Sequence, residues 1–419
     1  MNVTIKPTFL SGEVQMISSK SLSHRYLIAA GLSRGTSQID HVLDSEDITA
    51  TKKALEALNV SFKGNQVIGG NLKIIHQKID ANASGSTLRF MIPIFLLMNK
   101  KVFITGHGKL VSRPLDIYEN IFSKKKVFYQ RLGNDHLPIE IQGPLKSGYY
   151  PLPGNVSSQF ITGLMFALPL LKGDSVIEMT TPLESSGYVD ITMDVLQKFG
   201  IHILNVNQAY YINGSQIYQP QNIKIEGDYS QAAFFLVAGT IGKQLELTNL
   251  NPTSKQGDQY IIDIINQMGG DVSFDHLKEV LVVKPKQTHG IEINLSQIPD
   301  LGPVLMVLAA LSEGVTTFRH IERLRIKESD RLQAMLETLI KFGVEMTIEN
   351  DCAIIKGQKK LKGNQIFDCF SDHRIAMAIA IAAIRADGNV TILNAEAVKK
   401  SYPDFFNVYQ SLGGMIYES

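Results

Sequence analysis

The sequence predicts an α/β protein with two globular domains, each made of three modules in which buried helices are wrapped by sheets. Three observations indicate this fold class. A polar opening followed by a long apolar helix occurs six times, an alternating strand pattern follows each helix, and 419 residues are too many for one ordinary core. The openings begin at residues 19, 84, 155, 228, 298 and 371, so successive repeats lie 65 to 73 residues apart. That period is long enough for a complete supersecondary unit.

A short strand is predicted after each of these helices. The segments alternate polar or β-branched residues with apolar ones, as a half-buried strand does. They read GTSQIDHV, KKVFITG, GDSVIEMT, GKQLELTN, GVTTFRHI and GNVTILNA. After most of them a polar loop opens a second, amphipathic helix, such as 189–201, which leads to another strand, for example 202–212. Each repeat should therefore contain two helices and several strands.

The first helix of each repeat is apolar on nearly all faces, so it should be packed on all sides. No linker rich in Pro, Gly or Ser divides the chain, and the best seam is 224–231, just before the fourth repeat. A symmetrical layout puts the first residues with the second half. We expect one domain to comprise 20–226 and the other 1–19 with 227–419. The alternative is ordinary α/β alternation without a true repeat.

Composition excludes several classes of protein. Hydrophobic residues make up 44% and charged residues 19%, as in a globular chain, and the net charge of +1 provides no field for nucleic acid or a membrane surface. Two cysteines, Cys352 and Cys369, indicate a reducing compartment. Residues 1–14 lack a signal-peptide pattern, and the longest apolar run, 90–98, is far shorter than the roughly 20 residues of a membrane span. We expect a cytoplasmic protein that binds neither nucleic acid nor membrane.

Polar and cationic side chains gather at several of the six helix openings. A helix N-terminus carries free N–H groups and partial positive charge, which favour an anion. The side chains that decorate these openings are Lys20, Ser21, Ser23, Arg25, Ser84, Ser86, Ser157, Ser158, Gln159, Asp372, His373 and Arg374. A single Ser or Asp there is most simply an N-cap. Recurrence at equivalent places of a repeat favours a shared ligand site.

The loops after the strands carry a second set of candidates. They are Arg113, Ser185, Tyr188, Arg325, Lys327, Glu328, Asp330, Arg331, Lys399, Lys400 and Asp404. A charge run such as 323–331 is usually a solvated helix face, but this run occupies the same repeat slot as the other clusters. Lys and Arg gathered in one site would hold several negative charges, so small polyanionic substrates are expected. Asp300 and Glu328 are acids among these bases, and a carboxylate kept ionised by cations suits a general base.

Several cofactor motifs are missing from the sequence. It contains no GxGxxG, no GxxxxGK[ST] and no GxSxG. The ten histidines show no metal-ligand spacing, and no acidic cluster indicates an obligatory divalent ion. We therefore expect no nucleotide, metal, flavin or other cofactor.

A series of short motifs carries a family resemblance. They are SKSLSHR (19–25), SGSTLR (84–89), SRP (112–114), SSQF (157–160), SSGYVDIT (185–192), GDYSQAAFF (227–235), IPD (298–300), RIKESDR (325–331), DHR (372–374) and KKSYPDF (399–405). In this order and spacing they are highly specific. Nearly end to end, the chain resembles the EPSP synthases (3-phosphoshikimate 1-carboxyvinyltransferases) of the enolpyruvyl transferase family.

The resemblance implies a two-lobed, inside-out α/β barrel fold of six βαβαββ units, three per lobe, with the active site in the cleft between the lobes. It implies that phosphoenolpyruvate and shikimate 3-phosphate give 5-enolpyruvylshikimate 3-phosphate and phosphate by addition and elimination, in the shikimate pathway of aromatic amino acid biosynthesis. It also implies that no cofactor is needed and that the protein is a monomer.

The resemblance also assigns roles to residues. Asp300 would take the proton of the 5-hydroxyl group, while Lys20 and Glu328 would transfer protons at the methylene carbon. The residues expected around phosphoenolpyruvate are Lys20, Gly85, Arg113, Gln159, Arg331, Arg374 and Lys400. Those expected to hold shikimate 3-phosphate are Lys20, Ser21, Arg25, Ser157, Ser158, Gln159, Ser185, Tyr188, Asp300 and Lys327.

The chain departs from the family pattern at Ala83, Phe90 and Arg323, which bears on the detail of the phosphoenolpyruvate pocket and on glyphosate sensitivity. One rival function is transfer of enolpyruvyl to UDP-N-acetylglucosamine. That sister enzyme carries Lys-Asn in its first motif and a cysteine before its Arg-Pro, whereas this chain has Lys20-Ser21 and no cysteine in 105–114. The other rival is a non-catalytic α/β repeat protein that serves as a binding module.

Overall fold

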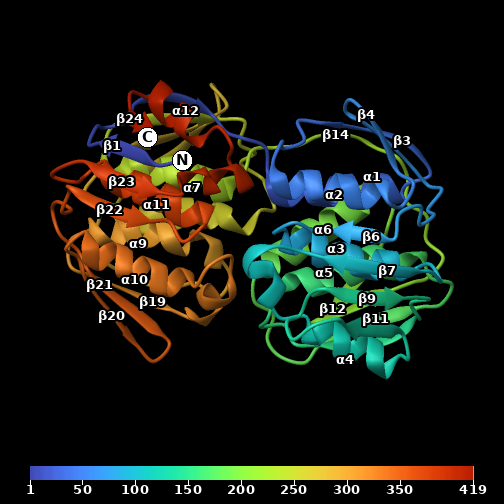
Figure 1. Ribbon diagram of the computed structural model, residues 1–419. Coiled ribbons are helices and arrows are strands. Elements are labelled where there is room, and N and C mark those ends of the chain that lie inside the picture. The colour runs from blue at the N-terminus through green and yellow to red at the C-terminus, as the bar shows by residue number, and fades with distance from the viewer. Residues whose placement is uncertain (419) are drawn as a thin grey trace. The chain divides into compact units, whose positions relative to one another are not determined.

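The structure is a computed structural model that describes residues 1–418, and these residues contain six four-stranded sheets (Figure 1). They divide into two compact units. The N-terminal unit is Ser19–Ile225, and the C-terminal unit combines Met1–Ser18 with the chain from Glu226 onward. Each unit holds three of the sheets.

One repeat of the N-terminal unit shows the pattern that the others follow. Strands β6 and β7 are parallel and are joined by helix α3, and helix α4 leads on to β8 and β9, which pair antiparallel with each other. Strand β9 also pairs antiparallel with β7, so the sheet order is β6-β7-β9-β8. This βαβαββ unit is the repeat that the sequence resemblance implies.

The sheets of the N-terminal unit comprise β14 (Asn222–Lys224), β3 (Gly35–Asp40), β5 (Gln66–Gly69) and β4 (Ser61–Lys63); β6 (Lys78–Asp80), β7 (Lys101–Thr105), β9 (Ile139–Gln142) and β8 (Phe128–Arg131); and β10 (Gly148–Leu152), β11 (Ser175–Met179), β13 (Ala209–Ile212) and β12 (Ile203–Val206). Those of the C-terminal unit comprise β2 (Gly12–Gln15), β15 (Leu245–Thr248), β17 (Val280–Lys284) and β16 (Asp271–Asp275); β18 (Glu292–Asn294), β19 (Val315–Arg319), β21 (Cys352–Lys356) and β20 (Glu345–Glu349); and β22 (Gln365–Asp368), β23 (Val390–Leu393), β1 (Val3–Lys6) and β24 (Met415–Glu418).

Three strands pair with strands that lie far from them in the sequence. Strand β1 pairs antiparallel with both β23 and β24, so the start of the chain supplies a strand to the last repeat. Strand β2 pairs parallel with β15 of the fourth repeat, and β14 pairs parallel with β3 of the first. The chain therefore leaves the C-terminal unit after Ser18 and returns to it at Glu226.

The first helix of each repeat forms the interior of its unit. These helices are α1 (Lys20–Leu32), α3 (Gly85–Phe95), α5 (Ser158–Ala167), α7 (Tyr229–Ile241), α9 (Gly302–Ala310) and α11 (His373–Ala383). Every residue of α9 and α11 is buried, and the exceptions in α1, α3 and α5 are Lys20, Ser21, Ser86 and Gln159. The apolar composition thus places the helices inside, and polar residues keep their N-terminal ends accessible.

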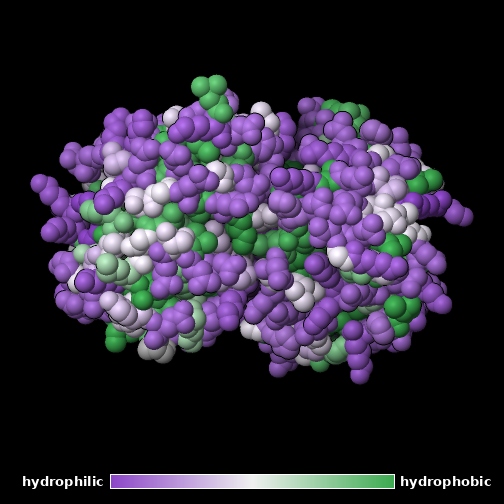
Figure 2. Space-filling view, turned by 90° about the horizontal axis from the view of Figure 1, so that it is seen from above, coloured by the Kyte–Doolittle hydropathy of each residue, from purple (hydrophilic) through white to green (hydrophobic). Residues whose placement is uncertain are grey.

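The second helix of each repeat is amphipathic and buries one face. These helices are α2 (Glu46–Glu56), α4 (Asp116–Lys124), α6 (Ser186–Lys198), α8 (Ile261–Gln267), α10 (Arg331–Lys341) and α12 (Phe405–Ser411). Figure 2 shows one face of the molecule, on which hydrophilic residues predominate. No helix among residues 1–418 is both long and apolar enough to cross a membrane.

The predicted fold class is confirmed, and one predicted strand is wrong. The segment 202–212 is a hairpin, since β12 and β13 pair antiparallel with Val206 opposite Ala209. Asn207 and Gln208 form the turn with φ of 49° and 65°. Positive φ at both central residues of a two-residue loop is typical of the type I′ turn, which matches the twist of the strands.

Helices α3 and α5 cross in close contact at Gly163. The hydroxyl of Tyr118 donates to the carbonyl oxygen of Arg89 in α3 at 2.7 Å. A Cβ atom at Gly163 would lie 2.3 Å from that carbonyl oxygen and 2.3 Å from the Tyr118 hydroxyl. Only a glycine therefore allows α5 to approach α3 this closely, and the approach sets the position of Arg89.

Replacing Gly163 by alanine should destabilise the protein by about 1–3 kcal/mol, because the added methyl group forces the two helices apart. The free energy of unfolding from urea titration checks this. Gly133→Ala is the matched control, since a Cβ atom there meets nothing within 4 Å. Equal stability of the two variants would contradict the close crossing.

Candidate active site

Asp300 lies at the centre of a charged cluster in the C-terminal unit. It belongs to the 3-10 turn Pro299–Leu301, directly before α9. Its Oδ1 lies 3.1 Å from Nζ of Lys327 and 2.9 Å from Nη1 of Arg331, and its Oδ2 lies 3.4 Å from Nη2 of Arg374. Nη1 of Arg374 also donates to the Asp300 carbonyl oxygen at 3.1 Å. One carboxylate thus gathers three of the cations that the sequence predicted for the substrates.

Arg331 is the most deeply buried of these cations, with a relative exposure of 1%. It is the first residue of α10. Its Nε lies 2.8 Å from Oδ2 of Asp372, and its Nη2 lies 2.6 Å from Oε2 of Glu328. Burial alone would lower the pKa of Arg331, but Asp372, Glu328 and Asp300 together raise it above its ordinary value. The guanidinium therefore stays charged inside the protein.

Asp372 positions two parts of the cluster at once. It is the N-cap of α11 and accepts from the backbone N–H of Arg374 at 2.9 Å. Its other oxygen accepts from the hydroxyl of Ser329 at 3.0 Å as well as from Arg331. The residue has no exposed surface. The sequence placed Asp372 at a helix opening, and its position shows that it also aligns Arg331 with Arg374.

Ion pairs join three cations and three carboxylates in this cluster. Its cations are Lys327, Arg331 and Arg374, and its carboxylates are Asp300, Glu328 and Asp372. The sequence had led us to expect a strongly cationic site. Among the described residues Asp300 lies beside all three cations, and Glu328 and Asp372 both pair with Arg331. The expected binding of anionic substrates by these cations stays a prediction.

The electrostatics of Asp300 and Lys327 follow from this pairing. Burial raises the pKa of Asp300, but Lys327, Arg374 and Arg331 outweigh it and hold the pKa well below its ordinary value. Burial lowers the pKa of Lys327 to about 8, although Asp300 acts in the opposite direction. Asp300 is therefore ionised, and Lys327 titrates just above neutral pH.

Asp258 is a further buried carboxyl group that sequence reasoning missed. Its relative exposure is 3%, and the hydroxyl of Ser230 in α7 donates to it. Burial raises the pKa of Asp258 to about 6, and the nearby charge of Asp300 adds to this, whereas Arg374 acts against it. No motif signalled this residue, because Ser230, Asp300 and Arg374 approach it only through tertiary packing.

Lys400 takes no part in this network. It ends the 3-10 segment Ala395–Lys400 and is half-buried. In the part of the chain that the structure describes, no hydrogen bond or ion pair joins it to the Asp300 cluster. Its predicted contact with phosphoenolpyruvate stays a prediction.

In the N-terminal unit, Lys20 forms an ion pair with Asp47. Lys20 is the first residue of α1, which Ser19 caps, and its Nζ lies 3.1 Å from Oδ2 of Asp47 in the first turn of α2. The two side chains are 16% and 7% exposed, so the pair is largely shielded from solvent. Sequence reasoning missed Asp47, although a carboxylate in the first turn of a helix capped by Ser45 was visible.

Arg25 ties α1 to α6 through neutral oxygen atoms. Its Nε donates to Oγ1 of Thr192 at 2.8 Å and its Nη2 to the carbonyl oxygen of Tyr188 at 2.9 Å. Nη1 donates to the carbonyl oxygen of Ser21 at 2.8 Å. Burial lowers the pKa of Arg25 to about 9, which leaves it charged at neutral pH. Three of the predicted shikimate 3-phosphate residues, Ser21, Arg25 and Tyr188, are thus brought together.

Arg89 joins the predicted phosphoenolpyruvate residues of this unit. Its Nη1 donates to Oε1 of Gln159 at 2.7 Å, and its Nη2 donates to the carbonyl oxygen of Pro114 at 3.0 Å. A Cβ atom at Gly85 would lie 2.8 Å from Nη1 of Arg113, so Gly85 allows that guanidinium to lie close to the start of α3. Arg89 ends the motif SGSTLR, and the sequence alone indicated no role for it.

The remaining predicted residues lie at helix starts. Ser157 is the N-cap of α5 and accepts from the N–H of Gln159 at 3.3 Å, and Ser158 is the buried first residue of that helix. Ser185 precedes α6 in the left-handed region, with φ of 54° and ψ of 44°, and its side chain makes no cap bond. A non-glycine residue held there is uncommon and is often found at functional sites.

Comparisons with known proteins agree with these features. The family model for EPSP synthase (3-phosphoshikimate 1-carboxyvinyltransferase) matches residues 5–409. The 3-phosphoshikimate 1-carboxyvinyltransferase of Clostridium novyi is 46% identical over 432 residues, covering 100% of this chain and 98% of that protein. The enzyme of the same name from Clostridioides difficile is 40% identical, with the same coverage. The structure of EPSP synthase from Acinetobacter baumannii aligns over 100% of both chains, with a TM-score of 0.83 and 26% identity.

The match covers nearly the whole chain, and the alignment to the solved structure extends over both compact units. The charged cluster around Asp300 and the polar helix starts of the N-terminal unit lie in segments that this match includes. On this evidence the chain belongs to the EPSP synthase family.

Proposed function

We propose that this protein transfers the enolpyruvyl group of phosphoenolpyruvate to the 5-hydroxyl of shikimate 3-phosphate and releases phosphate, a step of the shikimate pathway. The observation that carries the proposal is the family match over residues 5–409. Relatives named for this activity cover the chain at 40–46% identity. The Asp300 cluster supplies groups suited to the chemistry.

In the addition step the oxygen of the 5-hydroxyl forms a bond to C2 of phosphoenolpyruvate, its proton leaves, and the methylene carbon C3 gains a proton. In the elimination step C3 loses a proton, the double bond forms again, and the bond from C2 to the phosphate oxygen breaks. Both steps need a base, an acid and a clamp for negative charge in one site.

Asp300 is the residue that we assign to the 5-hydroxyl proton. It is ionised, as a base has to be, but its low pKa makes it a weak one. The cations that lower this pKa include Lys327, Arg331 and Arg374, which we also assign to the substrates. When their hydrogen bonds turn to phosphate and carboxylate oxygens, their hold on Asp300 weakens and its basicity rises.

Lys20 and Glu328 are the residues that we assign to proton transfer at C3. Lys20 is paired with Asp47, and Glu328 with Arg331. We further assign Gly85, Arg113, Gln159, Arg331, Arg374 and Lys400 to phosphoenolpyruvate, and Ser21, Arg25, Ser157, Ser158, Ser185, Tyr188 and Lys327 to shikimate 3-phosphate. We also propose that the protein is a monomer and that it lies in the cytoplasm.

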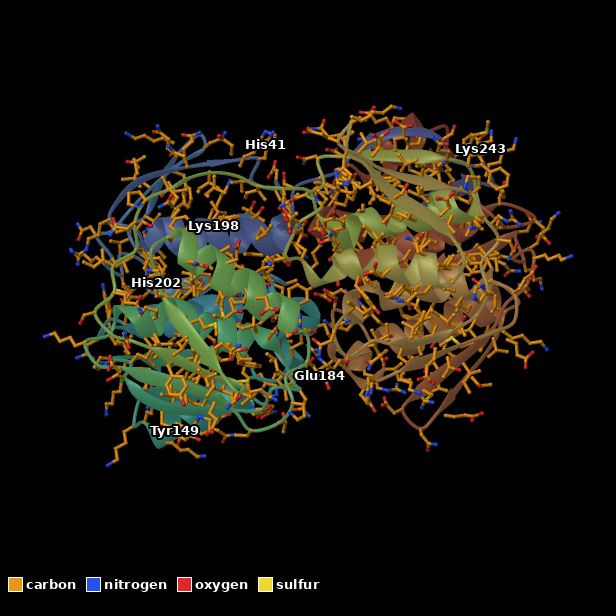
Figure 3. All side chains as sticks on the ribbon, turned by 180° about the vertical axis from the view of Figure 1, so that it is seen from behind. His41, Tyr149, Glu184, Lys198, His202 and Lys243 are labelled. Atoms are coloured by element: carbon orange, nitrogen blue, oxygen red, sulfur yellow. The ribbon has the colours of Figure 1, made fainter. Side chains whose placement is uncertain are left out.

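A phosphate-release assay tests the function directly. Phosphate should appear with phosphoenolpyruvate and shikimate 3-phosphate, and not when UDP-N-acetylglucosamine is the acceptor. Lys20→Met should be inactive, and Lys243→Met, at an exposed position (Figure 3), should match the wild-type protein. Release with the nucleotide sugar alone would establish the sister activity, and release with neither acceptor would leave only a binding module.

Asp300→Asn should lower kcat at least a hundredfold while the Kd for shikimate 3-phosphate changes less than about threefold, because the amide keeps the shape of the side chain but cannot take a proton. Stopped assays and calorimetric titration measure the two quantities. Equal losses in kcat and affinity would make Asp300 a binding residue instead.

Affinity for shikimate 3-phosphate should fall as the pH rises through about 8, because the buried ammonium group of Lys327 loses its charge there. One pH unit above that pKa about a tenth of the ammonium form remains, so binding at pH 9 should be roughly tenfold weaker than at pH 7. Lys327→Arg should remove the part of this dependence that centres on pH 8, because an arginine at this position stays charged there. The same pH profile in both proteins would exclude Lys327 as its origin.

A further inference from the structure

A chain of buried hydrogen bonds joins helices α1, α2 and α3. Nδ1 of His24 lies 2.7 Å from Oγ1 of Thr51, which lies 2.7 Å from Oγ1 of Thr87. The Thr87 hydroxyl donates to the carbonyl oxygen of Asp47 at 3.2 Å and to Oγ of Ser84 at 2.8 Å. His24, Thr51 and Thr87 are each at most 1% exposed. The catalytic scheme above uses none of these three side chains.

The number of available protons assigns a donor and an acceptor to each hydrogen bond of this chain of bonds. The carbonyl oxygen of Asp47 can only accept, so the single hydroxyl proton of Thr87 points toward Asp47 and Ser84. Thr87 must then accept from Thr51, and Thr51, whose proton is used, must accept from His24. This assignment puts the proton of His24 on Nδ1 and leaves Nε2, which has no hydrogen-bond partner among residues 1–418, as an acceptor.

The neutral state of His24 agrees with this direction. Burial lowers the pKa of His24 to about 3, and the charges of Lys20 and Arg25 act in the same sense, whereas Asp47 opposes them. The edge-to-face contact with Phe90, at a centroid distance of 6.2 Å, leaves the ring in an apolar setting. His24 is therefore neutral around neutral pH, and the hydrogen bonds keep one direction there.

Both ends of this series of hydrogen bonds lie at residues next to the candidate active site. The side chain of Asp47 pairs with the ammonium group of Lys20, and its carbonyl oxygen accepts a hydrogen bond from Thr87. Ser84 caps α3, and the next residue is Gly85, beside Arg113. His24 lies one turn after Lys20 on α1. A break in the chain would loosen the first turns of α2 and α3 relative to α1.

We propose that His24, Thr51 and Thr87 form a positioning relay that aligns Lys20 and Gly85 for phosphoenolpyruvate. The kinetic side of this inference rests on the proposed function. The relay residues do not touch the substrate; they act through Asp47 and Ser84.

Thr51→Val tests the relay by removing its central hydroxyl at nearly constant shape. We expect the KM for phosphoenolpyruvate to rise roughly three- to tenfold, the range of one lost hydrogen bond, and the KM for shikimate 3-phosphate to change less than twofold. Thr51→Ser, which keeps the hydroxyl, should stay within twofold of the wild-type protein. Thr51→Val combined with Thr87→Val should be no worse than the single variant, because both break the same chain.

Thr288→Val is the matched control. Thr288 and Ser312 form an equally short buried hydroxyl pair of 2.7 Å in the C-terminal unit, away from the residues assigned to the substrates. The thermal stability of the Thr288→Val variant should fall about as much as that of Thr51→Val, while both of its KM values stay unchanged. Unchanged KM values in Thr51→Val, or an equal rise in both, would reduce the relay to ordinary core hydrogen bonding and overturn the proposal.

A measurement without substrate separates this inference from the proposed function. The ¹⁵N spectrum of histidine-labelled protein, with His24 assigned through His24→Asn, should show the Nδ1-protonated tautomer and no titration between pH 5.5 and 8.5. The Nε2-protonated tautomer or a titrating ring would overturn the relay even in an active enzyme. If the wild-type protein releases no phosphate, the proposed function fails while this result still decides the direction of the chain.

Discussion

The need to enclose helices that are apolar on every face governs this structure. Helix α11 is buried along its whole length, and α9 is as well. A helix of this kind cannot lie at a surface, so each unit has to place sheets around its helices. The polar groups of such a helix can reach solvent only at its ends. The arrangement therefore concentrates hydrogen-bonding groups at helix N-termini, and there Lys20, Ser86 and Gln159 escape burial.

The helix ends that carry charged side chains also carry the partners of those charges. Asp372 caps α11 and holds Arg331, while Asp47 in the first turn of α2 holds Lys20. A buried cation without a partner is costly, and a paired one is fixed in direction. The pairing around Asp300 therefore serves the folded protein before any substrate binds. It also provides the means by which a bound anion could compete for the same cations and change the basicity of Asp300.

Much of the fold could be read from the sequence because its determinants are local. The six apolar segments, their N-caps at Ser19, Ser84, Ser157, Asp228 and Asp372, and the alternating strands each depend on neighbouring residues alone. The hairpin over 203–212 was missed because its turn, Asn207-Gln208, lacks a glycine. Three of the cations predicted to bind substrates do meet at Asp300, whereas Asp47, Arg89 and Asp258 went unassigned, since their partners lie in other repeats or other helices.

The sequence by itself determined the α/β class, the repeat, the interior helices and the types of residue at their N-terminal ends, because periodicity and capping act over a few residues. Only the tertiary structure decided which sheet each outlying strand completes, as when β1 enters the sheet of β23 and β24. It also decided which carboxylate faces which cation and which way the protons of His24, Thr51 and Thr87 point. These features depend on contacts between residues brought together by packing, and no local pattern encodes them.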